Sequence, residues 1–167
     1  MDDPVLARRS IRAYTDEPVG DAQVERLLRA AMAAPSAGNQ QPWRFVVVTD
    51  RAVLAQIPPV HPYARMLDHA PLAIVVCGVD HDIRWPALWP QDCAAAVENI
   101  LIEAVLLGLG AVWLGVYPID ERVAALRRLF AMPDEVTPFA VVAAGHPAAA
   151  KSPAERYQPD WVHRERW

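Results

Sequence analysis

The residues best suited to chemistry begin near the amino terminus, where Arg8-Arg9-Ser10-Ile11-Arg12 places three guanidinium groups and a hydroxyl in one short segment. A guanidinium group stays charged at physiological pH and donates two parallel hydrogen bonds, which suits it to phosphate. The cluster therefore predicts an anion site. The alternative is a basic turn that is solvated or paired with carboxylates such as Asp16 and Glu17, because charge runs usually face water.

A second segment, residues 34–43, combines small residues, three amide side chains and a proline–tryptophan step. The amides of Asn39, Gln40 and Gln41 both donate and accept hydrogen bonds, as the edge of a flat heterocycle with alternating N–H and C=O groups requires. Small residues let the backbone approach such a ring closely. The alternative is a turn that ends a helix and whose amides bind loop backbone.

A third segment, residues 113–118, contains Gly115 at the end of an expected strand. A glycine there permits close contact between the backbone and a planar ligand, and plain strand termination explains the pattern equally well. Gly108 and Gly110 do not form a dinucleotide-binding fingerprint, because the third glycine is absent and the pair follows a helix. A Rossmann-type dinucleotide-binding domain is therefore not expected.

Composition limits the remaining classes. The 167 residues are 53% hydrophobic with a formal net charge of -4, which predicts one folded domain over residues 1–167 and no basic field for nucleic acid. The longest apolar run, residues 104–117, is shorter than the ~20 residues that cross a bilayer, and residues 1–4 lack the features of a signal peptide. The spacing of the histidines and of Cys77 and Cys93 predicts neither a metal site nor a disulfide framework. We expect a cytoplasmic protein without nucleic-acid or membrane partners.

The elements that must position these segments follow from periodicity and turn residues. Asp21 can cap one helix, and Asp92 can cap a longer helix that ends at Gly108. β-branched runs predict strands, and residues 79–91 are expected to form a loop. The expected helices span 21–34, 52–57, 92–107 and 120–130, and the expected strands span 45–49, 72–77, 111–114 and 139–144.

Two features indicate a second subunit. The helix over 92–107 is apolar almost all round and is interrupted only by Glu98, Asn99 and Glu103 on one side. Such a helix needs cover on most of its surface, and we expect another subunit to supply part of it. The tail over 151–167 is polar and proline-punctuated yet carries Trp161 and Trp167, so we expect it to wrap a partner.

Together these segments resemble the FMN-dependent nitroreductase family. The resemblance rests on Arg8-Arg9-Ser10-Ile11-Arg12 and on the later Pro35-Ser36-x-x-Asn39-x-Gln41-Pro42-Trp43. Two glycine-containing segments add to it, Gly108-Leu109-Gly110-Ala111-x-Trp113-Leu114-Gly115 and Gly145-His146-Pro147. It implies an α+β nitroreductase-like fold with a central mixed or antiparallel sheet flanked by helices. It also implies a homodimer in which the C-terminal tail extends over the partner subunit.

The resemblance further implies an FMN site built by two subunits. The residues that match the segment holding the phosphate, the ribityl chain and the pyrimidine edge of FMN are Arg8, Arg9, Ser10 and Arg12. The residues that match a loop contributed by the opposite subunit are Pro35, Ser36, Ala37, Asn39 and Gln41. The residues that match the backbone along one face of the flavin ring are Gly115 and Val116. Arg156 matches a basic residue that reaches the phosphate, and Lys151 is a further candidate there.

By the same resemblance, Arg65 matches a basic position near the N1–C2=O edge of the flavin. Two-electron reduction leaves negative charge on N1 and O2, so a fixed cation there favours the reduced form. The alternative is a surface pair with Asp68 at i,i+3 spacing. No residue is assigned as a general acid, because flavin chemistry needs little from the protein beyond orientation and electrostatics.

The implied reaction is a ping-pong hydride transfer from NADH or NADPH, through flavin N5, to a nitroaromatic compound, a quinone or a similar electrophile. Trp85 and Trp89 are candidates for walls of the acceptor pocket, with packing at the dimer surface as the alternative. Within the same fold, reductive dehalogenation and breakdown of the flavin itself stay open. So does a flavin storage or sensing module with little turnover.

Overall fold

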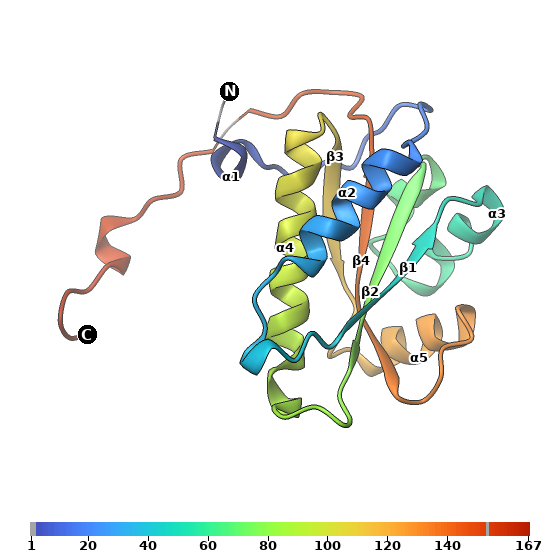
Figure 1. Cartoon of the computed structure of the whole chain (residues 1–167). Coiled ribbons are helices and arrows are strands. Elements are labelled where there is room, and N and C mark those ends of the chain that lie inside the picture. The colour runs from blue at the N-terminus through green and yellow to red at the C-terminus, as the bar shows by residue number, and fades with distance from the viewer. Residues whose placement is uncertain (1–2, 153) are drawn as a thin grey trace.

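A four-stranded antiparallel sheet forms the middle layer of the computed structural model, which describes residues 3–152 and 154–167. The strands lie in the order β1-β2-β4-β3 and span Trp43–Val48 (β1), Leu72–Val79 (β2), Gly110–Gly115 (β3) and Val136–Gly145 (β4). Each neighbouring pair runs antiparallel (Figure 1). Met1 and Asp2, which belong to the stretch that we tested for a signal peptide, lie outside the described residues.

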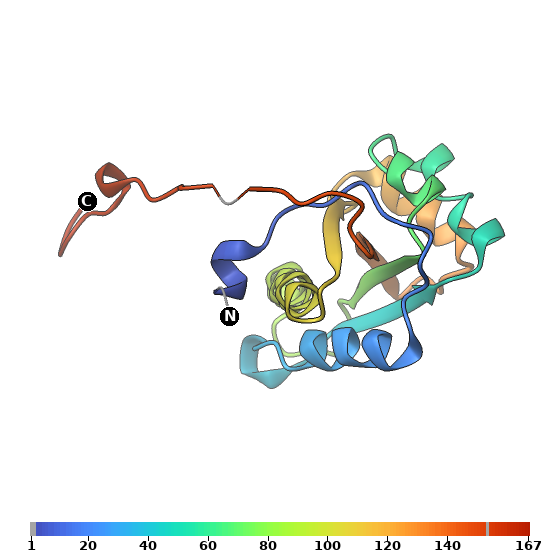
Figure 2. The same ribbon diagram turned by 90° about the horizontal axis from the view of Figure 1, so that it is seen from above.

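Helices cover both faces of the sheet. Alternate residues of β2 point to opposite faces, and every one from Leu72 to Gly78 is buried, as expected for a strand covered on two sides. One face packs against α2 (Asp21–Met32) and α4 (Trp89–Leu106), and the other lies towards α3 (Arg51–Leu54) and α5 (Asp120–Leu129), as Figure 2 shows. The α+β expectation is confirmed.

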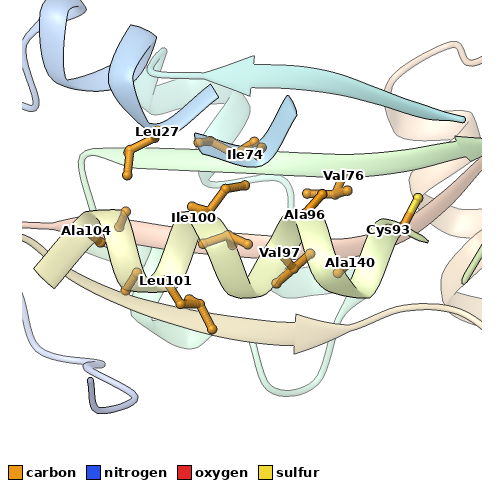
Figure 3. Packing of buried hydrophobic residues seen from close by; sticks show 14 of the residues in the cluster. Leu27, Ile74, Val76, Cys93, Ala96, Val97, Ile100, Leu101, Ala104 and Ala140 are labelled. Carbon is orange, nitrogen blue, oxygen red and sulfur yellow. The ribbon is translucent and has the colours of Figure 1, made fainter. Parts of the chain in front are cut away.

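The long helix α4 fills the larger core. Ala96 and Ile100 on α4 lie beside Ile74 and Val76 of β2, and Leu27 reaches them from α2 (Figure 3). All five side chains are fully buried. Burial of a large aliphatic side chain contributes roughly 1.5–3 kcal/mol, so this cluster fixes α4 firmly on the sheet.

The polar residues of α4 also serve packing. Asn99 Nδ2 donates to the Ala30 carbonyl of α2 at 2.9 Å, and Glu103 forms an ion pair with Arg26, also of α2. The side of α4 that carries Ile102 and Leu106 is less covered, and Leu106 is exposed. The expected cover by a second subunit stays a prediction.

The ends of the helices correct the sequence analysis in two places. The helix α2 is capped by Gly20, whose N–H donates to Gln23, and Asp21 is instead its first residue. The helix α4 starts at Trp89, so Asp92 lies inside it and the expected loop over 79–91 is too long. Pro90 lies in the expected loop because proline usually interrupts a helix. It suits the first turn of α4, however, where its missing N–H costs nothing.

The end of α4 agrees with expectation. Gly108 follows the C-cap with φ of 70°, a conformation that favours glycine. The N–H of Leu109 donates to the Ala104 carbonyl at 2.8 Å, and that of Gly108 to Val105 at 3.0 Å. This is a Schellman motif, which satisfies the last carbonyls and turns the chain into β3.

The C-terminal tail leaves the body of the protein as an extended segment. Its only regular piece among the described residues is the 3-10 turn Pro159–Trp161, and Trp161 and Trp167 are exposed. In Figure 2 it projects to the left of α4, past α1 (Pro4–Ala7). No described helix has the length and hydropathy needed to span a membrane.

Gly78 provides a test of this packing. A Cβ atom at Gly78 would lie 2.1 Å from Cε3 of the buried Trp89, so Gly78→Ala overpacks the junction of β2 and α4. We expect a loss of about 1–3 kcal/mol in the free energy of unfolding, measured with urea. In a Trp89→Leu background the same change should cost much less. An equal cost in both backgrounds would show that the indole is not the obstacle.

Candidate functional site

The arginine-rich segment is fixed to the sheet by its main chain. Ser10 forms a parallel bridge with Ala111 at the start of β3, and Ile11 N–H donates to the Ala111 carbonyl at 3.0 Å. Further along, Tyr14 forms an antiparallel bridge with Pro147, just after β4. Residues 10–15, called the arm below, therefore cross from β3 to the end of β4.

Two glycines allow this close approach. A Cβ atom at Gly110 would lie 2.7 Å from Cβ of Ile11, and one at Gly145 would lie 2.6 Å from Pro71 Cδ and 3.1 Å from Tyr14 Cδ1. The Tyr14 hydroxyl lies within hydrogen-bond distance of the carbonyls of Ile11 (2.6 Å) and Ala143 (3.1 Å). Burial raises the pKa of Tyr14 well above its usual value, so the phenol stays protonated and anchors the arm.

A cleft of about 410 Å³ opens beside the arm. Three residues selected from the sequence line it: Arg12, Arg65 and Gly115. Its other lining residues are His61, Pro62, Tyr63, Met66, Trp113 and Leu114. No carboxylate lines the cleft, and among the ion pairs of described residues none joins Arg65 to Asp68. The cleft therefore has a positive, partly aromatic lining.

A second cavity of about 390 Å³ shares Arg12 with this cleft. It is lined by residues 10–13 of the arm and by Ala149, Ala150 and Lys151. The ammonium group of Lys151 donates to the Ser10 carbonyl at 3.2 Å. Ser10 and Lys151 thus line a cavity that adjoins the cleft at Arg12.

A third cavity, of about 320 Å³, brings together Arg8, Arg9 and Arg156. Arg8 lies 3.3 Å from Glu98 of α4, so it is partly neutralised by a carboxylate other than those that we considered. Arg9 donates to the carbonyls of Ser152 (3.0 Å) and Leu6 (2.9 Å). Its Nη2 atom is buried with no hydrogen-bond partner among the described residues. A buried donor of this kind is costly unless an acceptor such as a phosphate oxygen reaches it.

The backbone at Gly115 is held from two sides. His61 Nε2 lies 2.9 Å from the Gly115 carbonyl, and Arg122 Nη1 donates to the same oxygen at 2.8 Å. A Cβ atom at Gly115 would meet nothing within 4 Å, so there is open space in front of it. The sequence analysis missed both partners, because neither has a local pattern that links it to Gly115.

The hydrogen bonds of His61 define its tautomer. Tyr63 N–H donates to Nδ1 at 3.3 Å, so Nε2 carries the proton and donates to Gly115. Burial, followed by the nearby Arg122 charge, lowers the pKa of His61 despite its hydrogen bond to Gly115. The ring is therefore a neutral donor at the edge of the cleft.

The amide-bearing loop, residues 34–43, is held against α4 and not at the arginine-lined cavities. Ala37 N–H and Gln40 Nε2 donate to the buried carboxylate of Asp92 at 2.9 and 2.7 Å. Gln40 therefore satisfies loop structure, as the turn alternative predicts. Asn39 and Gln41 are exposed and have positive φ values of 58° and 48°.

Within one chain the two groups of selected residues stay apart. None of the three arginine-lined cavities described above includes a loop residue, and the loop members that we selected are Pro35, Ser36, Ala37, Asn39 and Gln41. The Ser36 hydroxyl accepts from Gln41 N–H at 3.0 Å, which stabilises the turn. The loop residues therefore do not complete these arginine-lined cavities within one chain.

The structure also places three other candidates. Trp89 is buried against Tyr117 and Phe139, with ring centroids 4.7 and 5.9 Å away, so its assignment as a pocket wall is wrong. Trp85 is half-exposed, and its backbone hydrogen-bonds to Gln40. The side chain of Val116 is buried in the core, so only its backbone can face a ligand.

Comparison with known proteins gives consistent matches. The sequence profile of the Nitroreductase family matches residues 5–70 and 58–146. An Archaeoglobus fulgidus protein, provisionally named NADH dehydrogenase/NAD(P)H nitroreductase, is 47% identical over 167 residues, with 98% of this chain and 96% of its own covered. The crystal structure of a provisionally named NADH oxidase from Clostridium acetobutylicum has a TM-score of 0.96 at 44% identity, covering 99% of this chain and 100% of its own. A provisionally named nitroreductase from Desulfovibrio desulfuricans, solved in complex with FMN, has a TM-score of 0.84 at 34% identity, covering 100% and 99%.

The lowered pKa of His61 predicts a pH-dependent stability. Below the ordinary histidine pKa of 6.5 the unfolded chain takes up a proton that folded His61 does not. The free energy of unfolding of the wild type should therefore fall, relative to that of His61→Phe, as the pH drops from 6.5 towards the lower folded pKa. Above that window the difference should be constant. Urea titrations of both proteins across pH measure it, and a difference that does not change with pH would contradict the neutral, buried assignment.

Proposed function

The chain belongs to the nitroreductase family, and we propose that it is an FMN-dependent oxidoreductase that takes electrons from NADH or NADPH and delivers them to a nitroaromatic compound, a quinone or a similar electrophile. The observation that carries this proposal is the cleft in which Arg12, Arg65 and Gly115 converge. Their types and order along the chain match the flavin-binding pattern, and the fold is that of the FMN-bound Desulfovibrio protein.

The residues present fit FMN. The unpartnered Nη2 of Arg9 offers a buried donor for a phosphate oxygen, and Arg156 and Lys151 add positive charge nearby. The open space in front of Gly115 leaves room for a flat ring. A cleft of about 410 Å³ is within the size range of small-molecule sites. When bound, FMN supplies a hydride acceptor and donor at N5, chemistry that no side chain provides.

The side chains of this protein supply orientation and charge. Arg12 and Arg65 place two fixed cations in a cleft without carboxylates, which favours negative charge on whatever ring lies there. Arg65 holds the position expected to face N1 and O2 of the flavin. Trp113 adds an apolar wall to the cleft, and Tyr63 adds an exposed ring at its edge.

The proposal includes a homodimer in which Asn39 and Gln41 of one subunit complete the cleft of the other. Both side chains are exposed, and neither lines the arginine cavities of its own chain. The partly covered side of α4, with exposed Leu106, offers a surface for a second copy. The extended tail with Trp161 and Trp167 has the reach and the aromatic side chains to lie across it (Figure 1).

The function is tested on purified protein with added FMN. We expect a yellow protein that binds FMN and that NADH or NADPH bleaches in the absence of oxygen, followed by recovery of the colour with a nitroaromatic acceptor. Colourless protein that binds no FMN would eliminate the proposal. Bleaching without acceptor turnover would favour a storage module, and loss of the flavin in air would favour flavin breakdown.

The shared site is tested by mixing two defective chains. Arg12→Ala removes a charge-assisted contact, worth about 1.5–3 kcal/mol, and Asn39→Gly removes the amide while tolerating the left-handed backbone. Each variant alone should bind FMN weakly. After subunit exchange between equimolar amounts, half of the dimers pair the two variants and hold one intact site each, so about a quarter of all sites should recover tight binding in a fluorescence titration.

The matched control mixes wild type with a chain that carries both changes. A mixed dimer of that kind has one defect in each site, so it should add no tight sites beyond those of wild-type dimers. Failure of the first mixture to recover, with stable dimers present, would place the whole site within one chain and overturn the shared arrangement.

A further inference from the structure

The peptide between Gly115 and Val116 is fixed at both of its polar ends. Its N–H, from Val116, donates to the Phe139 carbonyl of β4 at 3.1 Å. Its C=O, from Gly115, accepts from His61 at 2.9 Å and from Arg122 at 2.8 Å. Three elements thus hold one peptide group: β4, the segment after the 3-10 turn Pro58–Val60, and α5.

Tyr63 contacts both donors to the carbonyl. The Arg122 guanidinium carbon lies 5.4 Å from the centre of the Tyr63 ring, and Tyr63 N–H fixes the tautomer of His61. Tyr63, whose ring is exposed, therefore orients Arg122 through its side chain and His61 through its backbone N–H. His61, Tyr63 and Gly115 of this network line the cleft, and no member of the network lines the cavity that contains Arg8, Arg9 and Arg156.

We propose that His61 and Arg122 are positioning residues that fix the Gly115–Val116 peptide against the cofactor ring by two hydrogen bonds to the Gly115 carbonyl. The inference rests on the proposed FMN function and deepens it. Neither residue is catalytic: both act through the backbone that the ring contacts. A preset backbone costs no reorganisation when charge develops beside it.

The network also sets the charge at that wall of the cleft. A carbonyl oxygen carries partial negative charge, which disfavours added electrons on a ring beside it. Two donors, one of them cationic, offset that charge. Loss of a donor should therefore make the reduction potential of bound FMN more negative, as well as loosening the ring.

Three variants separate positioning from folding. His61→Phe fills the same space without a donor, and His61→Gln keeps an N–H near the position of Nε2. Arg122→Met keeps an apolar stem over Tyr63 but cannot donate. Arg128→Met is the matched control, since Arg128 is an exposed residue of the same helix outside the cleft lining.

The measurements are the FMN dissociation constant by fluorescence, the midpoint potential and visible spectrum of the bound flavin, and the melting temperature of apoprotein. We expect His61→Phe and Arg122→Met each to raise the dissociation constant about 3- to 10-fold, the size of one net hydrogen bond. The potential should move to more negative values. The double variant should lose more than the product of the single losses, because either donor can hold the carbonyl alone. His61→Gln and Arg128→Met should stay close to wild type.

The outcomes distinguish this inference from the function that it builds on. Wild-type protein that binds no FMN would overturn both. Wild-type binding, together with donor-less variants that keep the wild-type potential, spectrum and dissociation constant, would overturn the positioning role alone. A change confined to the melting temperature would also overturn that role, because a purely structural contact moves stability without moving the potential. A His61→Gln variant that behaves like His61→Phe would contradict it as well.

Discussion

The site depends on the seating of the arm against the sheet. The main chain of residues 10–15 bonds to β3 and to the residues after β4, and Gly110 and Gly145 lack the Cβ atoms that would push it away. A displaced arm would carry Arg12 out of the cleft and out of the adjoining cavity, and so away from Arg65. Gly110 and Gly145 therefore act on the site through packing.

The sequence predicts much of this arrangement, because its strongest patterns are local. The expected strands agree with every strand of the described sheet to within a few residues, and Gly108 marks the end of α4 correctly. The segment over residues 8–12 is recognised from residue type alone, since three arginines and a serine in one segment suit an anion. What local patterns cannot supply is the partner of a backbone group. His61 and Arg122 converge on Gly115 from two separate elements, and each reads by itself as an ordinary residue.

Asp92 shows why one assignment failed and what the failure reveals. An aspartate at the start of an apolar run is typically an N-cap, but here the helix begins at Trp89 and the carboxylate is buried. It instead accepts hydrogen bonds from Ala37 N–H and Gln40. A buried carboxylate is stable only when it is well satisfied, so this contact fixes the loop. The fixed loop leaves the side chains of Asn39 and Gln41 exposed.

The proposed site takes some of its residues from one chain and others from a second chain, which couples ligand binding to dimer formation. Arg12, Arg65 and Gly115 are assembled by the fold of a single chain, whereas Asn39, Gln41 and the tryptophans at the end of the tail are exposed. A ligand that binds both groups binds only the assembled pair, so by mass action it stabilises the pair as well as the fold. Cofactor affinity and subunit affinity are then coupled to the same degree in both directions. In the proposed dimer, loss of a contact in the cleft would weaken subunit association, and dilution of the dimer would release the cofactor.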